Sequence, residues 1–568
     1  MWRYRKLKRV GFLKQWSVSA GILIISAVFS TGARADLLSA EDRVQLLYSN
    51  RFIFDNRGVP LIRVSVMEGR SEVTVESEDG LVVLPSGPGG PEVLGGKTWK
   101  FTIGKAQPAK VRYWTVLGRH SGPAAGWGSK MEKLWKEKGV DIKLFETGSV
   151  FAVSGNVVDN RSAVAACCPR DDHRVASRIA ALMGKKHGIR TGLHAELVER
   201  SKGVITAESS DRGLSVRNEG MIWLAPAGGG RITVRQVEHG KGYSWHGFAD
   251  RTYWGMVYIA VDRNGKLAVV NAVSADRILA GLVPAEIFPS APMEALKAQA
   301  VAARGQLLAK LGKRHLADPY PLCAAQHCQV YSGAGREHPR TTRAVNETRG
   351  LILMDAGGRL ADTVYHSTCG GHTEHNENVW QTPPRGDLRG RADIGHGTTF
   401  WHNHFKKGKG VQGALERWLR KPPDTYCSQY SQNKRSVFRW KERRSAEDLT
   451  KSIGRSLGVG RVLEINVVAR GVSGRAKEIS IRGEKGAASV TGELNIRRKL
   501  GNLKSSMFIV RAIPEKSKRP KEFEFKGGGW GHGVGMCQMG AMGMARAGHR
   551  LNEILSFYYR NTKLIRLY

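Results

Sequence analysis

One carboxyl group stands in a setting that suits proton transfer. Glu286 lies among Val283, Ile287, Phe288 and two prolines, directly before a predicted helix. Apolar surroundings disfavour the charged form of a carboxyl group, so its pKa is expected to rise toward neutrality. A general acid that protonates a glycosidic oxygen needs this protonated form. The residue types alone, however, favour the plainer interpretation of a solvated loop glutamate.

A second cluster has the composition of a metal site. His315, Cys323, His327 and Cys328 place two imidazoles and two thiols within 14 residues. Four such ligands are sufficient for tetrahedral zinc, which would also fix a loop with little core of its own. The spacing is not that of a standard zinc finger. A Cys323–Cys328 disulfide is equally compatible with it in an oxidising compartment.

Two glycine-containing stretches complete the candidate chemistry. In residues 365–374 a His, a Ser and a Cys invite a nucleophile interpretation, but adjacent residues rarely form a working triad, and a polar loop is the plainer alternative. Residues 527–541 lack the Lys-Ser/Thr pair of a phosphate loop. Trp530 there could stack on a sugar and His532 could make a polar contact, although a tightly packed structural loop is equally compatible.

Periodicity indicates the elements that would position these residues. Apolar residues from Met293 to Leu307 recur on one helical face, and residues 257–270 read as a hairpin turning at Asn264-Gly265. Residues 36–105 read as short strands. Residues 106–206 follow the order strand, helix, strand, strand, helix, strand, with the two middle strands predicted at 142–144 and 150–153. We therefore predict a multi-domain α+β fold, in which small β and α+β modules precede a mixed, strand-rich catalytic region.

Four segments in order resemble the SpoIID/LytB family. The first contains Val283-Pro284-Ala285-Glu286 and the helix that begins with Glu294-Ala295-Leu296-Lys297. The others are His327-Cys328-Gln329-Val330-Tyr331, the loop 365–371, and the Gly-Trp-Gly-His-Gly-Val-Gly-Met run within 529–541. Ile287 replaces the usual Met, and Gly305 replaces a frequent Thr. The resemblance covers about 245–568, and we assign 207–568 to this region, with core motifs at 276–380 and 525–568.

The resemblance implies an activity on peptidoglycan. Catalytic family members are lytic transglycosylases that cleave the MurNAc–GlcNAc bond of peptide-stripped glycan and leave 1,6-anhydro ends, and the acid/base position corresponds to Glu286. Other members are named enhancers of cell-wall amidases, so a non-catalytic, glycan-binding enhancer is the alternative. Zinc is associated with the family at positions that match Cys323, His327 and Cys328, with His315 as a fourth candidate. The remaining motif residues are assigned to substrate binding: Gln329, Tyr331, His366, Ser367, Trp530, His532 and Gln538.

The α+β module at 106–206 resembles a SPOR domain, a family that binds peptide-stripped glycan strands. This resemblance rests on the order of elements and not on a sharp motif. It implies that the module docks the protein on its substrate. An unrelated small α+β domain is the alternative interpretation.

Charge and the N-terminus point to an exported protein. Lys and Arg outnumber Asp and Glu by 89 to 50. Residues 1–35 combine a basic start, a short apolar stretch and Ala33-Arg34-Ala35, which is typical of a cleaved secretory signal, with an uncleaved anchor as the alternative. A basic exported protein is expected to meet an anionic envelope surface in the periplasm or cell wall. Nucleic acid binding is not expected, because it would rest on charge alone.

Overall fold

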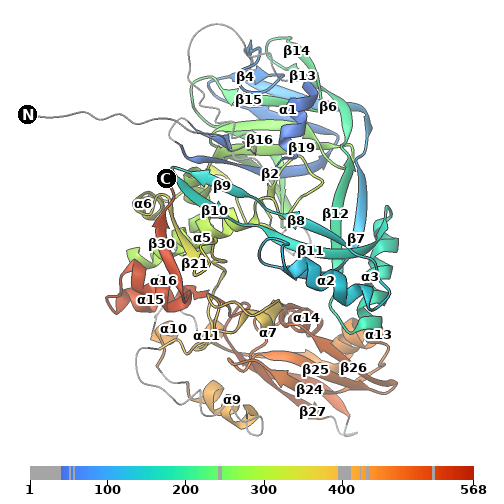
Figure 1. Ribbon diagram of the computed structural model, residues 1–568. Coiled ribbons are helices and arrows are strands. Elements are labelled where there is room, and N and C mark those ends of the chain that lie inside the picture. Colours follow the sequence, from blue (N-terminus) through green and yellow to red (C-terminus); the bar gives the residue numbers. More distant parts are fainter. Residues whose placement is uncertain are drawn as a thin grey trace, which may run out of the picture.

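The computed structural model describes residues 40–49, 53–55, 58–240, 246–325, 327–380, 382–394, 411–422, 424–429, 435–514 and 519–568. The predicted signal segment, residues 1–35, lies outside these ranges. The fold is α+β and multi-domain, as predicted (Figure 1). Among the described residues, no helix combines the length and apolarity needed to cross a membrane.

Two sheets at the top of Figure 1 share one hydrophobic core. The first has the order β1-β2-β19-β18-β15-β4-β5 and the second the order β14-β13-β6-β3-β16-β17. The first sheet consists of β1 (Ile53–Phe54), β2 (Pro60–Arg70), β4 (Leu81–Leu84), β5 (Val93–Leu94), β15 (Met221–Pro226), β18 (Met256–Val261) and β19 (Leu267–Ser274). The second consists of β3 (Glu72–Glu76), β6 (Thr98–Gln107), β13 (Lys202–Ser209), β14 (Ser215–Glu219), β16 (Ile232–His239) and β17 (Gly247–Tyr253). The β18–β19 pair is the hairpin predicted at 257–270.

Strand pairing joins segments that the sequence analysis placed in separate regions. Strands of 36–105 pair with strands of 202–274 in both sheets, for example β2 with β19 and β6 with β13. The expected division at residues 206 and 207 therefore runs through a continuous sandwich. Hydrogen-bond register between segments so far apart leaves no local signal in the sequence, which explains the difference.

The α+β module is inserted into this sandwich. Its sheet has the order β12-β7-β11-β8, with every pair antiparallel, which is the split βαβ arrangement. The elements are β7 (Lys110–His120), α2 (Trp127–Lys136), β8 (Lys143–Thr147), β11 (Ser162–Arg170), α3 (His173–His187) and β12 (Gly192–Glu199). The predicted strand at 150–153 forms a separate hairpin of β9 (Val150–Val153) and β10 (Asn156–Asp159). The strand that completes the sheet is β11, which the sequence analysis missed.

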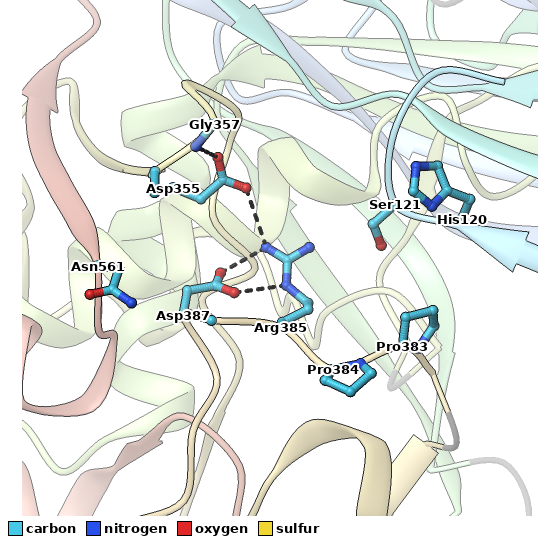
Figure 2. Close-up of a pocket in the computed structure, with 11 residues that line it drawn as sticks. His120, Ser121, Asp355, Gly357, Pro383, Pro384, Arg385, Asp387 and Asn561 are labelled. Carbon is cyan, nitrogen blue, oxygen red and sulfur yellow. Dashed lines mark hydrogen bonds and ion pairs between the residues drawn. The ribbon is translucent and has the colours of Figure 1, made fainter. Parts of the chain in front are cut away.

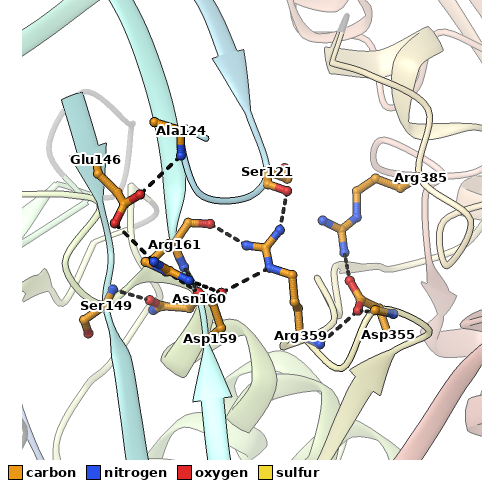
Figure 3. A network of polar contacts seen from close by, with 11 residues as sticks. Ser121, Ala124, Glu146, Ser149, Asp159, Asn160, Arg161, Asp355, Arg359 and Arg385 are labelled. Carbon is orange, nitrogen blue, oxygen red and sulfur yellow. Dashed lines mark hydrogen bonds and ion pairs between the residues drawn. The ribbon is translucent and has the colours of Figure 1, made fainter. Parts of the chain in front are cut away.

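The part of the chain with the four motifs, mainly 276–380 and 525–568, is named the catalytic region here because the sequence predicts catalysis there. Polar contacts fix the α+β module against it (Figure 3). Asn160 donates its amide to the carbonyls of Leu308 and Leu311 at 2.8 and 3.0 Å. Arg359 donates to the carbonyl of Arg161 at 2.5 Å and lies 3.7 Å from the Asp159 carboxylate. Because these contacts join the module to the end of a buried helix, the orientation of the module is coupled to the catalytic region.

A buried helix organises the catalytic region. This helix, α5 (Met293–Lys310), is the one predicted from the apolar face, and it is buried along most of its length. It is buried because α4, α6, α15, α16 and β21 surround it. The surrounding elements are α4 (Ala275–Glu286), α6 (Pro339–Glu347), β21 (Leu351–Asp355), α15 (Gln538–Arg546) and α16 (Leu551–Tyr558), and β21 pairs with β30 (Thr562–Arg566). The first and last motifs therefore meet in space.

Between these motifs the chain forms a further strand-rich body with its own core, drawn in orange at the bottom of Figure 1. One sheet has the order β23-β28-β27 and the other β24-β25-β26. The elements are α9 (Val411–Arg420), α10 (Tyr426–Gln429), β23 (Arg439–Ser445), β24 (Val462–Arg470), β25 (Ala476–Gly483), β26 (Gly486–Thr491), α14 (Glu493–Lys499), β27 (Phe508–Pro514) and β28 (Pro520–Gly528). The sequence analysis did not separate this body from the catalytic region.

Candidate functional site

Glu286 lies on the wall of a cavity of about 350 Å³. It is the last residue of α4, where Pro284 removes a backbone donor and the helix ends at Ile287. Residues from all four motifs line the cavity together with the end of α5. The described lining residues are Glu286, Gln306, Lys310, Cys328, Gln329, Val330, Val364, Tyr365 and His532.

Burial raises the pKa of the Glu286 carboxyl above its usual value. Two groups act in the opposite direction: the positive charge of Lys310 and a hydrogen bond with Tyr365. The desolvation effect is the larger one. The protonated form expected from the apolar neighbours of Glu286 is therefore favoured, while both partners needed to stabilise the carboxylate are in place.

Tyr365 connects Glu286 to the Cys/His segment. It lies on β22 (Tyr365–His366), which pairs in parallel with β29 (Met536–Cys537). The Gln329 amide donates to the Tyr365 hydroxyl oxygen at 3.0 Å, which leaves the hydroxyl proton available to the Glu286 carboxylate. Burial, followed by the nearby charge of Glu286, raises the pKa of Tyr365, so this hydroxyl stays protonated.

Gln538 binds the backbone of Glu286 rather than the Glu286 side chain. Its amide donates to the Glu286 carbonyl at 2.9 Å and to Gln299 Oε1 at 3.1 Å. Gln538 is the first residue of α15 and Gln299 lies in α5, so the two hydrogen bonds fix the end of α4 between these helices. Gln538 is thus a positioning residue in this geometry and not a substrate contact.

His532 is a neutral imidazole at the edge of the cavity. Its Nε2 donates to the Tyr365 carbonyl at 3.0 Å, and its Nδ1 accepts the Val534 amide at 3.0 Å. These partners require the tautomer with the proton on Nε2. Burial, with the neighbouring His366, lowers the pKa of His532 well below its usual value. The Trp380 ring lies 5.0 Å from the imidazole.

Four other residues assigned to substrate binding do not line this cavity. Tyr331 is buried, and its hydroxyl donates to Asn271 Oδ1 at 3.1 Å. His366 is also buried, and its Nδ1 lies 3.1 Å from the Val534 carbonyl oxygen. Ser367 is half-buried, and its carbonyl accepts the Met539 amide. Trp530 is 46% exposed on the same loop as His532. Its position leaves it accessible to a ligand.

The Cys/His segment brings its four side chains to one point. The ligand atoms of His315, Cys323, His327 and Cys328 all lie within 4.8 Å of one another, and both cysteines are thiols rather than a disulfide. His315 Nδ1 lies 2.9 Å from Asp318, while its Nε2 is buried without a hydrogen-bond partner among the described residues. A carboxylate behind a ligating imidazole is the usual support of a zinc ligand. The residues therefore fit a tetrahedral zinc ion.

A second cavity, of about 290 Å³, lies where the α+β module meets the catalytic region (Figure 2). Arg385 is fixed there by Asp387, with contacts of 2.9 and 2.7 Å, and lies 3.8 Å from Asp355. The charge of this arginine is neutralised by its neighbours. The cavity shares no lining residue with the one at Glu286, and the ion pairs of Arg385 join it to Asp387 and Asp355.

Sequence reasoning missed Gln306, Lys310, Tyr365 and Trp380 as site residues. A signal exists for the first two, because Gln299, Gln306 and Lys310 are polar residues that recur on one face of a largely buried helix. Tyr365 directly precedes the His-Ser motif. Trp380 has no such signal, since its approach to His532 depends on tertiary structure.

Comparison with known proteins finds two family models. The model described as Stage II sporulation protein (SpoIID) matches residues 263–354, which include Glu286 and the Cys/His segment. The domain of unknown function DUF8618 matches residues 374–535, which begin just after the loop 365–371 and run into the loop 529–541, including His532.

Two curated proteins are similar over about half of the chain. An uncharacterized protein of Brachyspira hyodysenteriae is 27% identical over 318 residues, 55% of this chain and 72% of that protein. The amidase enhancer of Bacillus subtilis is 28% identical over 300 residues, 50% of this chain and 40% of that protein. The chain therefore spans less than half the length of the amidase enhancer.

Proposed function

The chain carries a SpoIID/LytB-family region, as its motifs predicted, and we propose that it is an exported lytic transglycosylase of peptidoglycan. Its substrate is the MurNAc–GlcNAc bond of peptide-stripped glycan, and Glu286 is the acid/base. The observation that carries the proposal is the convergence of Glu286, Tyr365 and His532 on one cavity. Burial raises the pKa of the only acidic side chain among the described residues that line it.

The reaction requires Glu286 to act twice. As an acid, it gives its proton to the bridging oxygen while the bond between this oxygen and MurNAc C1 breaks. As a carboxylate, it then accepts the proton of the MurNAc 6-hydroxyl, whose oxygen bonds to C1 and closes the 1,6-anhydro ring. Atoms and charge balance without water, and Glu286 ends protonated as it began.

The surroundings of Glu286 suit both steps. Burial favours the acid before the bond breaks. After the transfer, the Lys310 charge and the Tyr365 hydroxyl stabilise the carboxylate. A hydrolysing glycosidase ordinarily uses two carboxyl groups, whereas one is sufficient when the substrate supplies its own nucleophile.

Zinc at the Cys/His segment would be structural in this proposal. Cys323, Cys328, His315 and His327 would hold it with four protein ligands, the arrangement of structural rather than catalytic zinc sites. Cys328 also lines the cavity, and Lys310 donates to its carbonyl at 2.5 Å. The ion would therefore fix the loop that presents Gln329 to Tyr365.

Charge and the α+β module support a location at the cell wall. Removal of the seven Lys and Arg residues in 1–35 leaves the mature chain with a net charge of about +32. This charge suits an anionic envelope surface in the periplasm or cell wall. The SPOR-like order of elements supports docking on peptide-stripped glycan, with orientation fixed by the contacts of Asn160 and Arg359.

The product identifies the reaction. Full-length mature protein is incubated with peptide-stripped glycan strands, and the soluble fragments are analysed by mass spectrometry. We expect fragments with 1,6-anhydro-MurNAc ends from the wild type and none from Glu286→Gln. Release of the same fragments by Glu286→Gln would refute the assignment of the acid.

The second candidate is a non-catalytic enhancer of a cell-wall amidase, favoured by the name of the Bacillus subtilis relative. In this case the cavity binds glycan without cleaving it. Stimulation of a purified amidase on intact sacculi, equal for wild type and Glu286→Gln and without anhydro products, would support the enhancer over the enzyme.

A further inference from the structure

A second cluster of metal-ligating side chains lies away from the Cys/His segment. The ligand atoms of Cys369, Asp393, Cys427 and Cys537 all lie within 4.8 Å of one another, and all four residues are buried. The sequence shows no sign of this cluster, because its members are spread over 169 positions. Neither Cys369 nor Cys537 was considered a ligand in the sequence analysis.

The four side chains come from different parts of the fold. Cys369 follows β22 in the loop that begins with Tyr365, and Cys537 ends β29 and caps α15. Cys427 lies in α10, and Asp393 lies in a loop whose backbone binds the start of that helix, with the Tyr426 amide donating to the Asp393 carbonyl at 2.8 Å. Two ligands thus belong to the DUF8618 match, and the other two lie just outside its ends.

The spacing suits one tetrahedral ion. The sulfur atoms of Cys369 and Cys427 are 3.6 Å apart. Two thiolates bound to one zinc ion at about 2.3 Å stand about 3.8 Å apart in tetrahedral geometry. A disulfide would bring the two sulfur atoms to about 2.05 Å.

Backbone donors already surround the sulfur atoms. Cys537 Sγ accepts the Cys369 and Gly540 amides at 3.2 and 3.3 Å, and Cys369 Sγ accepts the Gly371 amide at 3.3 Å. Backbone N–H groups and a helix N-terminus stabilise thiolates, the form in which cysteine binds metal.

The carboxylate is supported in the same way. Asp393 Oδ1 accepts the Tyr558 hydroxyl at 2.6 Å, and Oδ2 accepts the Cys427 amide at 3.0 Å. Hydrogen bonds of this kind orient ligating carboxylates in metal sites. Asp393 is thus held with its oxygens beside the three sulfur atoms.

Two arginines lie beside the cluster. Arg475 is buried and donates to the Cys369 carbonyl at 3.0 Å, and Arg439 is half-buried and donates to the Gly370 carbonyl at 3.0 Å. Three thiolates and a carboxylate exceed the charge of a divalent ion by two, which the two guanidinium groups offset, although Arg475 also faces Glu374.

We propose that Cys369, Cys427, Cys537 and Asp393 bind one Zn²⁺ in a closed structural site. Thiolates select a soft or borderline ion, and a compact shell of one carboxylate and three thiolates suits a single zinc ion. Binding releases the three thiol protons to solvent. Since all four ligands are buried, the shell has no open position for substrate.

The site would attach the segment that carries Asp393 and Cys427 to the two loops that contain Tyr365 and His532. Cys369 lies four residues after Tyr365, and Cys537 directly precedes Gln538, whose amide holds the Glu286 carbonyl. The ion would therefore fix both loops relative to Glu286. This inference concerns metal content and stands independently of the proposed lytic activity.

Metal analysis of the full mature chain tests the inference. Wild type, Cys427→Ser and Cys323→Ser are expressed with zinc, purified without chelator and measured by plasma mass spectrometry. We expect Cys427→Ser to contain about one zinc equivalent fewer than wild type. Cys168→Ser is the matched control outside both clusters and should retain the wild-type content. An unchanged zinc content in folded Cys427→Ser would overturn the proposal.

A second measurement decides the case if Cys427→Ser fails to fold. The double variant Cys323→Ser/Cys328→Ser removes two ligands from the Cys/His segment but leaves this cluster intact. Loaded with Co²⁺, it should show the charge-transfer and tetrahedral ligand-field absorption of cobalt thiolate. Absence of these bands would overturn the proposal. So would a Cys369–Cys427 disulfide, detected when alkylation of the denatured, unreduced wild type leaves two cysteines unlabelled.

Discussion

Two cavities of similar volume hold ionisable groups in opposite states. The cavity at Glu286, of about 350 Å³, contains a carboxyl group whose charge burial disfavours. The cavity at Arg385, of about 290 Å³, contains a guanidinium group that Asp387 holds with two hydrogen bonds. A group whose charge is paired by its neighbours contributes to the stability of the fold, whereas a carboxyl group whose protonated form is favoured by burial can donate a proton. The difference separates a candidate site of chemistry from a structural ion pair.

The largest expected effect is the loss of activity on removal of the acid. Glu286→Gln keeps the shape of the side chain but has no proton to donate at working pH, so the rate of anhydro-fragment release should fall at least about 100-fold. Glu294→Gln is the matched control, because Glu294 lies outside the cavity and pairs with Lys297 at 2.9 Å. Equal losses in the two variants would remove the distinction between Glu286 and an ordinary glutamate.

A substitution of Arg385, in the second cavity, should lower the stability of the fold and leave the activity unchanged. Arg385→Gln leaves the Asp387 carboxylate without its main partner and should lower the free energy of unfolding by about 1–3 kcal/mol. The rate of glycan cleavage by the folded protein should stay within about twofold of wild type. Denaturant titration and fragment release measure the two quantities, and a large loss of activity without a loss of stability would contradict the assignment of this cavity.

Removal of the Tyr365 hydroxyl should have a smaller effect with a diagnostic pH dependence. Tyr365→Phe deletes the hydrogen bond that lowers the pKa of Glu286, so this pKa should rise further. The alkaline limb of the pH–rate profile, where the acid loses its proton, should move to higher pH. The maximal rate should fall by about tenfold, because the carboxylate loses a stabilising partner. An unmoved alkaline limb would mean that Tyr365 has only a packing role.

The smallest effect is a difference in the pH dependence of stability. Because the folded pKa of Glu286 is raised, the folded state binds the proton more tightly than the unfolded state, and stability declines as the pH rises through the interval between the unfolded and folded pKa values. Glu286→Gln lacks this decline. The variant should therefore gain stability relative to wild type as the pH rises above about 4.5. Paired urea titrations at acidic and neutral pH measure the difference, and a loss relative to wild type would show that the carboxylate is stabilised by the fold.

Parts of this arrangement could be predicted from the sequence where the signal is local. The helix α5, the β18–β19 hairpin and the cluster from His315 to Cys328 each lie within a short segment, and the structure contains each of them. The apolar neighbours of Glu286 also indicated its raised pKa correctly.

Features that depend on distant pairing were not predicted. The sandwich pairs β2 with β19, which are far apart in the sequence. The cluster of Cys369, Asp393, Cys427 and Cys537 likewise forms only because four distant segments meet in the fold. Tyr331 and His366 were assigned to substrate from their motifs, yet both side chains are buried away from the cavity. A motif identifies residues that a fold requires, and only the tertiary structure separates contacts with substrate from contacts within the core.

The most direct test of the central claim identifies the source of the oxygen atom that bonds to MurNAc C1 when the glycosidic bond breaks. Wild-type protein digests peptide-stripped glycan in water enriched in the heavy oxygen isotope, and the new ends are examined by mass spectrometry. If Glu286 passes the proton of the 6-hydroxyl as proposed, the new MurNAc ends are anhydro sugars without the heavy isotope. New reducing ends that carry the heavy isotope would show that water is the nucleophile and would contradict the account.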